Sequence, residues 1–349
     1  MEASEVTRGS FVPDDADVKG LVALTGATGF IGGALAKQLV SAGWRVNALV
    51  RGLPKARALQ RPGVTVIQGD LSDAEALQSL LCGVTAVVHC AGAVRGIDDE
   101  DFVRVNVAGT ERIAAVAARM NPPPLFVSLS SLAAREPHLS AYAASKLAGE
   151  AALARVAGAM PVTILRPPAV YGPGDREMLP LLLLMMRGIA PVLGPSHARF
   201  SMLYIDDLAS AVEQSLLAGE RGRGVFELHD GRVGGYTWDA VVEAASGVRG
   251  KPVRTFVLPR HLLHSLALVS RRWGRLTRKA PMLTPGKVRE LTHPSWVCDN
   301  TEVSRALGWT PRIEFAEGLR RTLEHNRAVK RATPEARTGR TGSAKASPR

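Results

Sequence analysis

Residues 21–43, "LVALTGATGFIGGALAKQLVSAG", combine a short apolar run, a glycine-rich turn and a helical pattern. Ile31, Leu35 and Leu39 recur at four-residue spacing, which places their side chains on one face of a helix. The apolar run before the turn has the length and composition of a buried strand. The stretch therefore predicts a strand, a tight turn and a helix, which is the start of a parallel βαβ unit.

Further apolar runs follow, separated by helical stretches. They are "RVNALV" (45–50), "VTVIQGD" (64–70), "AVVHCAG" (86–92), "PLFVSLSS" (124–131) and "VTILRP" (162–167). Regular alternation of strands and helices is typical of a parallel sheet covered by helices on both faces. We therefore expect an α/β fold, with a Rossmann-like doubly wound parallel sheet and a smaller C-terminal substrate-binding lobe.

The expected domain boundaries lie where this alternation begins and ends. We expect a disordered N-terminus (1–18), an NAD(P)-binding Rossmann domain (19–170), a substrate-binding lobe (171–326) that interleaves with the end of the sheet, and a disordered basic tail (327–349). The tail is rich in Pro, Gly, Ser and Thr and has no apolar period, so it cannot bury enough surface to fold.

Composition excludes several classes of protein. The three cysteines, Cys82, Cys90 and Cys298, form no C-x-x-C pair, which argues against a disulfide framework or a zinc site, and we expect no metal. No apolar run reaches the ~18 residues of a membrane span, and the N-terminus lacks the pattern of a signal peptide. Half of the net charge of +12 lies in the tail, which we expect to be solvated. We therefore expect a cytoplasmic protein without a nucleic-acid partner.

The glycines of the first turn have the spacing that a dinucleotide site needs. Gly26 permits the tight turn, Gly29 lets the backbone approach a pyrophosphate, and Gly32 lets the helix pack closely on the strand. The free N–H groups and the dipole at the start of the helix then face the phosphates. This arrangement predicts a dinucleotide cofactor.

The end of the second strand indicates which dinucleotide binds. An acid there would bind the ribose 2′-hydroxyl of NAD, but this chain has Val50 followed by Arg51, with Lys55 and Arg57 nearby. A guanidinium suits a 2′-phosphate. We therefore favour NADP(H) over NAD(H), the alternative being that Arg51 is an ordinary exposed loop residue.

Tyr142 and Lys146 lie one helical turn apart in "YAASK", so their side chains share one face of a helix. A free tyrosine, with a pKa of ~10, is a poor base near neutral pH. A neighbouring ammonium group favours the phenolate, so we expect Lys146 to lower the pKa of Tyr142. Tyr142 can then exchange a proton with a substrate hydroxyl or carbonyl group.

Taken together, these motifs resemble the extended short-chain dehydrogenase/reductase family, which includes NAD-dependent epimerases and dehydratases. The resemblance covers roughly residues 20–325 and is nearest to the 3β-hydroxysteroid dehydrogenase and dihydroflavonol reductase branch. It is carried by "TGATGFIG", "GDL" (69–71), "HCAG" (89–92), "VNVAGT", "SLSSLAA" (128–134), "YAASK", "RPPAVYGPGD" (166–175), "YIDDLA" and "LGWTPRIEFAEGLRRT". Members are often dimers, so a homodimer is open. The segment from Ser131 to Tyr142, which contacts substrate in the family, is shorter here than in many members.

The resemblance implies a set of site residues. The catalytic ones are Ser131, which holds the substrate oxygen, with Ser130 as the alternative, and Tyr142 and Lys146. Lys146 also binds the nicotinamide ribose, and Asp70 contacts the adenine. The cofactor-binding residues are Gly26, Thr28, Gly29, Phe30, Ile31, Gly32, Arg51, Asp70, Leu71, Ala91, Gly92, Asn106, Tyr142, Lys146, Pro167 and Val170. His89, Tyr171 and the pair Asp206 and Asp207 are read as packing or capping residues instead.

The predicted activity is that of an NAD(P)-dependent oxidoreductase acting on CH–OH or C=O groups. Apolar segments at 179–186 and in "RHLLHSLALVSRRWGRLTRKA" (260–280) favour a bulky apolar substrate, such as a sterol, a hopanoid-type lipid or a keto-ceramide. The alternatives are a nucleotide-sugar epimerase or dehydratase, with Arg187, Arg199 and Arg260 serving a diphosphate, and a non-catalytic NADPH-binding accessory protein. The 260–280 segment is read as a lid helix, with peripheral contact to the inner face of a membrane as the alternative.

Overall fold

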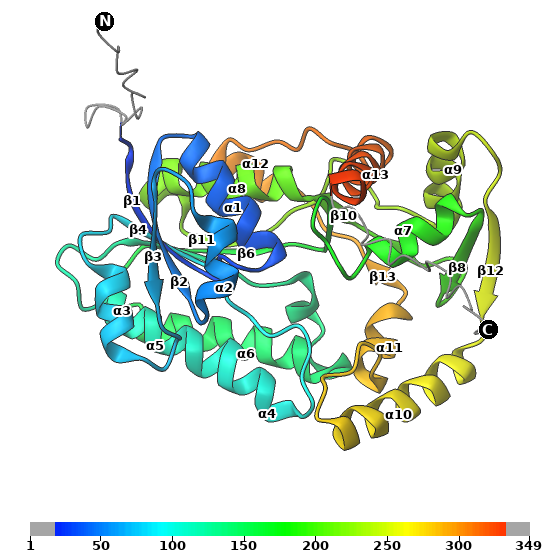
Figure 1. Ribbon diagram of the computed structural model, residues 1–349, viewed down its shortest axis with the longest axis horizontal. Helices are drawn as coiled ribbons and strands as arrows, with labels where there is room; N and C mark the ends of the chain where they lie inside the picture. Colours follow the sequence, from blue (N-terminus) through cyan, green and yellow to red (C-terminus); the bar gives the residue numbers. More distant parts are fainter. Residues whose placement is uncertain (1–17, 333–349) are drawn as a thin grey trace, which may run out of the picture.

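A computed structural model describes residues 18–332, in which seven parallel strands form the main sheet (Figure 1). The spatial order is β11-β6-β5-β4-β1-β2-β3. These strands are β1 (Gly20–Thr25), β2 (Trp44–Val50), β3 (Val64–Gln68), β4 (Ala86–His89), β5 (Leu125–Leu129), β6 (Val162–Arg166) and β11 (Gly224–Glu227). The order reverses between β1 and β4, and such a switch point is where doubly wound sheets bind ligands.

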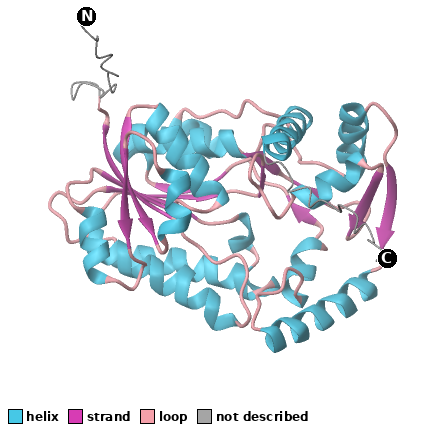
Figure 2. Ribbon diagram, in the orientation of Figure 1, coloured by secondary structure: helices cyan, strands magenta, loops and turns pink. Residues whose placement is uncertain are grey.

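Helices cover both faces of the sheet (Figure 2). One layer contains α1 (Phe30–Ser41), α8 (Ile205–Ala218) and α12 (Thr301–Leu307), and the other contains α3 (Ala74–Leu81), α5 (Thr110–Ala117) and α6 (Ala141–Val156). The alternation of side chains along β1 explains the two layers, since Val22 and Leu24 join the first core and Ala23 joins the second. In the central strands β1, β4 and β5 both faces are buried, which is why these strands are almost continuously apolar.

The second lobe contains three small two-stranded parallel sheets. They pair β7 (Ala169–Tyr171) with β10 (Met202–Tyr204), β8 (Ile189–Leu193) with β12 (Arg254–Leu258), and β9 (Arg199–Phe200) with β13 (Ser295–Trp296). Its helices are α7 (Leu179–Met186), α9 (Trp238–Arg249), α10 (Arg260–Thr277), α11 (Pro285–Leu291) and α13 (Phe315–Ala332). The short helices α2 (Leu53–Ala56) and α4 (Asp99–Phe102) lie in the first lobe.

The predicted fold class is confirmed, and the two lobes interleave. The chain leaves the main sheet after β6, builds part of the second lobe, and returns to place β11 beside β6. The domain boundaries stay predictions. No helix within residues 18–332 is long and apolar enough to cross a membrane.

One prediction about the C-terminus is wrong in part. The segment 327–349 was expected to be disordered, but α13 continues to Ala332. Arg327 and Arg331 lie in its last two turns, where cations interact favourably with the negative end of the helix dipole. Residues 1–17 and 333–349, and the disorder predicted for them, lie outside the described residues.

Asp207 fixes α8 to the segment that leads into α13. Its buried carboxylate accepts hydrogen bonds from the backbone N–H of Arg312, at 3.1 Å, and of Ile313, at 2.9 Å. Burial raises the pKa of this carboxyl group, and the two N–H donors oppose the rise. Asp206, its neighbour, is exposed in the first turn of α8.

Replacing Asp207 by Ala should destabilise the protein by about 2–4 kcal/mol, because buried N–H groups lose their acceptor. Asp206→Ala is the matched control and should cost about 0.5 kcal/mol, the value of an exposed acid at a helix start. Urea unfolding followed by circular dichroism measures both. Equal losses in the two variants would show that the Asp207 contacts contribute little.

Candidate active site

The turn between β1 and α1 packs directly against the end of β4. Gly26 has a φ of +73°, and a Cβ placed on it would lie 2.7 Å from the backbone N of Ala91. A Cβ on Gly32 would lie 2.1 Å from the carbonyl O of Gly26. Both positions therefore require glycine, for the turn conformation and for the close approach of α1.

The first turn of α1 leaves its N–H groups available. Gly29 is the N-cap residue, no side chain caps the helix, and the first turn has no acid. Thr28 and Gly29 are exposed, whereas Phe30 and Ile31 are half-buried and pack on the core of the second lobe. Uncapped N–H groups at the switch point of the sheet form a site for a pyrophosphate, so the residues present fit a dinucleotide.

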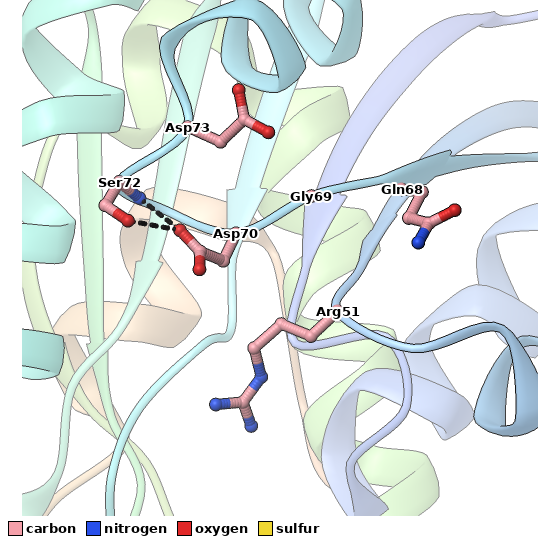
Figure 3. Close-up of a pocket in the computed structure, with 6 residues that line it drawn as sticks. All are labelled: Arg51, Gln68, Gly69, Asp70, Ser72 and Asp73. Carbon is pink, nitrogen blue, oxygen red and sulfur yellow. Dashed lines mark hydrogen bonds between the residues drawn. The ribbon is translucent and has the colours of Figure 1, made fainter.

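Arg51 and Asp70 line one pocket at the ends of β2 and β3, with Gln68, Gly69, Ser72 and Asp73 (Figure 3). Ser72 donates from its backbone N, at 2.7 Å, and its hydroxyl, at 2.5 Å, to Asp70 Oδ1. These hydrogen bonds hold the pKa of the Asp70 carboxyl group below its usual value, and the positive charge of Arg51 lowers it further. Arg51 itself is exposed, and it forms no ion pair within residues 18–332. Its guanidinium group is therefore free to meet an anion.

Tyr142 and Lys146 lie on adjacent turns of α6, and both are half-buried. Lys146 Nζ donates to the carbonyl O of Leu129, the last residue of β5, at 2.9 Å. This contact anchors the lysine at the carboxyl end of the sheet, beside the cofactor turn. The ring of Phe102 meets the ring of Tyr142 edge-on, with 6.3 Å between centroids, so one wall next to the phenol is apolar.

The pKa of Tyr142 differs from the expectation. Burial raises the pKa of the Tyr142 phenol to about 12, and the Ser131 hydroxyl partly offsets this rise. Burial also lowers the pKa of Lys146. The predicted lowering by Lys146 therefore does not occur in the protein alone, because burial dominates and the nearby charge that acts on the phenol, that of Glu290, raises its pKa further. The Tyr142 hydroxyl is protonated at neutral pH.

The two serines at the end of β5 have different partners. A hydrogen bond from the Ser131 hydroxyl lowers the pKa of the Tyr142 phenol. The Ser131 Oγ also accepts a hydrogen bond from the backbone N of Ala133 at 3.2 Å. Ser130 instead donates to Glu150. Glu150 also accepts two bonds from Arg166, at 2.9 and 2.5 Å. The geometry thus brings Ser131 to the tyrosine and assigns Ser130 to a structural network.

Asn106 braces the loop after β4 against α6. It lies in a π-helical stretch, Val103–Gly109, and exchanges two hydrogen bonds with the backbone of Ala93, at 2.7 and 3.0 Å. Its Nδ2 also donates to Ser145 Oγ at 2.8 Å, and Ser145 donates to the carbonyl O of Tyr142 at 2.8 Å. A Cβ on Gly92 would lie 3.1 Å from Lys146 Nζ. Gly92 therefore lets the loop and the lysine approach.

His89 connects the turn between β1 and α1 to the hydrogen bonds of Asn106. Thr110 Oγ1 donates to the carbonyl O of Asn106, so it can only accept from His89 Nε2, 3.0 Å away. The His89 Nδ1 then accepts from Thr25 Oγ1 at 2.9 Å, and Thr25 accepts from the backbone N of Ala91. Burial, and then the Lys146 charge, lower the pKa of His89 to about 3. His89 is a neutral structural histidine, as the sequence indicated.

Two residues that position α6 were missed in the sequence. Ser140 caps the helix by accepting from the backbone N of Ala143 at 2.9 Å, and its hydroxyl donates to the buried Glu290 of α11. Arg289 donates to the carbonyl O of Leu139 at 2.7 Å. A serine just before a helix is a readable cap signal. Glu290 carried no signal, because it is 150 residues away in sequence.

The remaining predicted residues lie around this centre. Leu71 contacts the helix at Gly109, where a Cβ would lie 2.8 Å from Leu71 Cδ1. The carbonyl O of Pro167 accepts from the backbone N of Leu132 at 2.8 Å. Val170 is half-buried between the cores of the two lobes. Tyr171 is fully buried against Tyr204 and Phe315, as a packing residue.

Comparison with known proteins agrees with this geometry. Residues 22–227 match the family described as the NAD dependent epimerase/dehydratase family. The chain belongs to this family. An epimerase/dehydratase structure, UDP-glucuronic acid 4-epimerase from Bacillus cereus in complex with UDP-glucuronic acid and NAD, superposes with a TM-score of 0.69 at 19% identity, covering 88% of this chain and 99% of that one. At this identity the likeness shows the fold.

Two relatives are similar over nearly their whole length. A ceramide reductase from Caulobacter vibrioides is 38% identical over 317 residues, 90% of this chain and 96% of the relative. A 2-alkyl-3-oxoalkanoate reductase from Stenotrophomonas maltophilia is 29% identical over 328 residues, 86% of this chain and 97% of the relative. The protein is therefore an enzyme of the oxidoreductase type within the epimerase/dehydratase family.

His89 should make the protein less stable in acid. The unfolded histidine takes up a proton below about pH 6.5, whereas the folded one stays neutral down to about pH 3, so stability is lost as the pH falls through this window. Between about pH 7 and about pH 5, His89 should account for a loss of about 2 kcal/mol. Urea unfolding at both pH values should show that the loss is smaller by this amount in His89→Gln. His138→Gln, at an exposed histidine, is the control and should lose as much as the wild type. An unchanged loss in His89→Gln would contradict the buried neutral state.

Proposed function

We propose that the protein reduces a keto group on a bulky, largely apolar lipid, with NADPH as the hydride donor. The observation that carries the proposal is the protonated hydroxyl of Tyr142, which lies one helical turn from Lys146 on α6. Ser131, just after β5, lies beside this hydroxyl. A phenol held in its neutral form is suited to donate a proton to a carbonyl oxygen.

Each residue of the site has a role in this reaction. Ser131 holds the carbonyl oxygen beside Tyr142, and Tyr142 donates the proton that converts this oxygen to a hydroxyl. The phenolate that remains is stabilised by the Ser131 hydroxyl. The glycine turn, the first turn of α1, and Gly92, Asn106 and Lys146 would hold the dinucleotide, which supplies the hydride when bound.

Two observations support a lipid as the substrate: the names of similar proteins and the apolar ring of Phe102 beside Tyr142. The names of the two similar reductases specify ceramide and a 2-alkyl-3-oxoalkanoate, and Phe102 packs against Tyr142. A keto-ceramide is the substrate we would test first. The apolar segment 179–186, which favoured this class in the sequence, instead packs into the lobe core through Leu182 and Met185. It therefore lends the proposal no support.

The nucleotide-sugar reaction is the rival within the same family, whose solved members include UDP-sugar enzymes. Of the three arginines considered for a diphosphate, Arg199 donates to the carbonyl O of Gly234 at 2.9 Å, while Arg187 follows α7 and Arg260 begins α10. The two reactions differ in redox balance. Ketone reduction consumes one NADPH for each product, whereas epimerisation regenerates its cofactor in every turnover.

Tyr142→Phe should lower kcat for keto-ceramide reduction by about 10²–10⁴-fold, the usual contribution of a positioned proton donor. NADPH affinity should change little, because the glycine turn and Lys146 remain. NADPH oxidation measures the rate, and mass spectrometry of the alcohol identifies the product. Ser131→Ala should also lose activity, whereas Ser130→Ala is the matched control and should stay near the wild type.

The same measurements separate the alternatives. Conversion of a UDP-sugar without net NADPH consumption would establish the epimerase reaction instead. An unchanged cellular role in Tyr142→Phe, together with NADPH binding but no turnover of any ketone, would establish a non-catalytic accessory protein.

NADP(H) preference should depend on Arg51. Arg51→Ala should weaken NADPH binding by about 10- to 100-fold, the value of a charge-assisted contact to phosphate, and leave NADH binding nearly unchanged. Calorimetric titration of both nucleotides measures this. Arg57→Ala, at an exposed cation downstream of Arg51, is the control. An equal loss for NADPH and NADH would show that Arg51 does not read the 2′-phosphate.

A further inference from the structure

Helix α10 presents an apolar stripe to solvent. Leu262, Leu266, Val269, Trp273 and Leu276 follow one another at spacings of four and three residues, so they lie along one face. Their exposed fractions range from 41% to 79%. Leu263, Ala267 and Gly274, which lie about a third of a turn around the helix from the stripe, are buried against the protein. The stripe therefore points away from the protein, and α10 follows the lower edge of the second lobe (Figure 1).

The surroundings of the stripe are strongly cationic. From Arg249 to Arg289 the chain contains eleven lysines and arginines and no aspartate or glutamate. Arg272 and Arg275 on α10, with Arg278 and Lys279 just after it, are exposed and form no ion pair within residues 18–332. These cations are thus available to an anionic partner.

We propose that α10 docks on the surface of an anionic lipid bilayer. An amphipathic helix with leucine and tryptophan on one face and unpaired cations beside it lies in the plane of the membrane interface. The stripe would enter the boundary between head groups and acyl chains, where the indole of Trp273 has an apolar body and a polar N–H. The arginines would contact the lipid phosphates. The proposal does not depend on which ketone the enzyme reduces.

A second copy of the chain fits this surface poorly. A two-fold contact between two α10 helices would bring two acid-free cationic segments together. Paired helices with such an apolar seam normally carry opposite charges beside it, but Arg272, next to the stripe, has no acid to meet on an identical helix. Charge therefore favours a bilayer over a dimer.

The test is binding of the full chain to sedimented vesicles of phosphatidylcholine alone and of phosphatidylcholine mixed with phosphatidylglycerol. The wild type should bind the mixed vesicles at least about tenfold more tightly than the neutral ones. The double variant Trp273→Gln/Leu276→Gln should lose at least about tenfold in binding to the mixed vesicles. Arg272→Gln/Arg275→Gln should weaken binding and reduce its salt dependence. Val233→Gln, at an exposed apolar residue elsewhere in the lobe, is the control.

Tryptophan fluorescence is a second measurement, and the attraction of a basic protein to anionic lipid would not by itself change it. Trp273 is exposed, whereas Trp44, Trp238 and Trp309 are buried and Trp296 is partly buried. Mixed vesicles should shift the wild-type emission to the blue, and Trp273→Phe should keep binding but lose the shift. The proposal is overturned if the glutamine double variant binds as well as the wild type, which would reveal non-specific attraction of a basic protein. It is also overturned if the wild type binds no vesicle and instead forms a dimer that this variant disrupts.

Discussion

The close approach of the Gly26 turn to the end of β4 is the constraint on which the site depends. A side chain at position 26 would collide with the backbone of Ala91, so the glycine lets two neighbouring strand ends meet. From this contact a continuous set of hydrogen bonds runs through Thr25, His89 and Thr110 to Asn106, and then through Ser145 to the backbone of Tyr142. The turn between β1 and α1 and the helix α6 are thus held by one buried network. Its histidine stays neutral, because burial, and then the charge of Lys146, lower the pKa of His89 to about 3.

Local patterns in the sequence were sufficient for the sheet, the glycine turn and the pair Tyr142 and Lys146. These features depend on periodicity, on backbone conformation and on spacing within one helix. All three are determined by residues that are close together in the sequence. The strand β11 was missed, since its pairing with β6 joins segments that are far apart in the chain. Glu290 was missed for the same reason. Residues 327–332 were assigned to a disordered tail instead of a helix, because a basic, polar composition describes both a tail and a solvated helical turn.

Electrostatics in the site could not be read from spacing alone. A lysine one turn from a tyrosine predicts a lowered phenol pKa, yet burial raises the pKa of Tyr142 to about 12. Burial is a property of the whole fold: Phe102, Ser131 and Glu290 come from three different elements, and the charge of Glu290 itself favours the neutral phenol. The apolar segments show the same limit. Both segments were interpreted as apolar in the sequence, but the fold shows that 179–186 packs in the core whereas the apolar stripe of α10 faces outward.

The contacts of α11 connect this outward surface to the reaction centre. Val288 of α11 packs against Leu263 and Ala267 of α10, while Glu290 and Arg289 of the same helix hold Ser140 and Leu139 at the start of α6. Ser140 in turn caps the helix that carries Tyr142. The short helix α11 therefore contacts both α10, which carries the proposed membrane-binding surface, and the start of α6, which carries Tyr142. With α10 on a bilayer, as proposed, this arrangement would fix the height of Tyr142 above the lipid, because α10 and the start of α6 both contact α11.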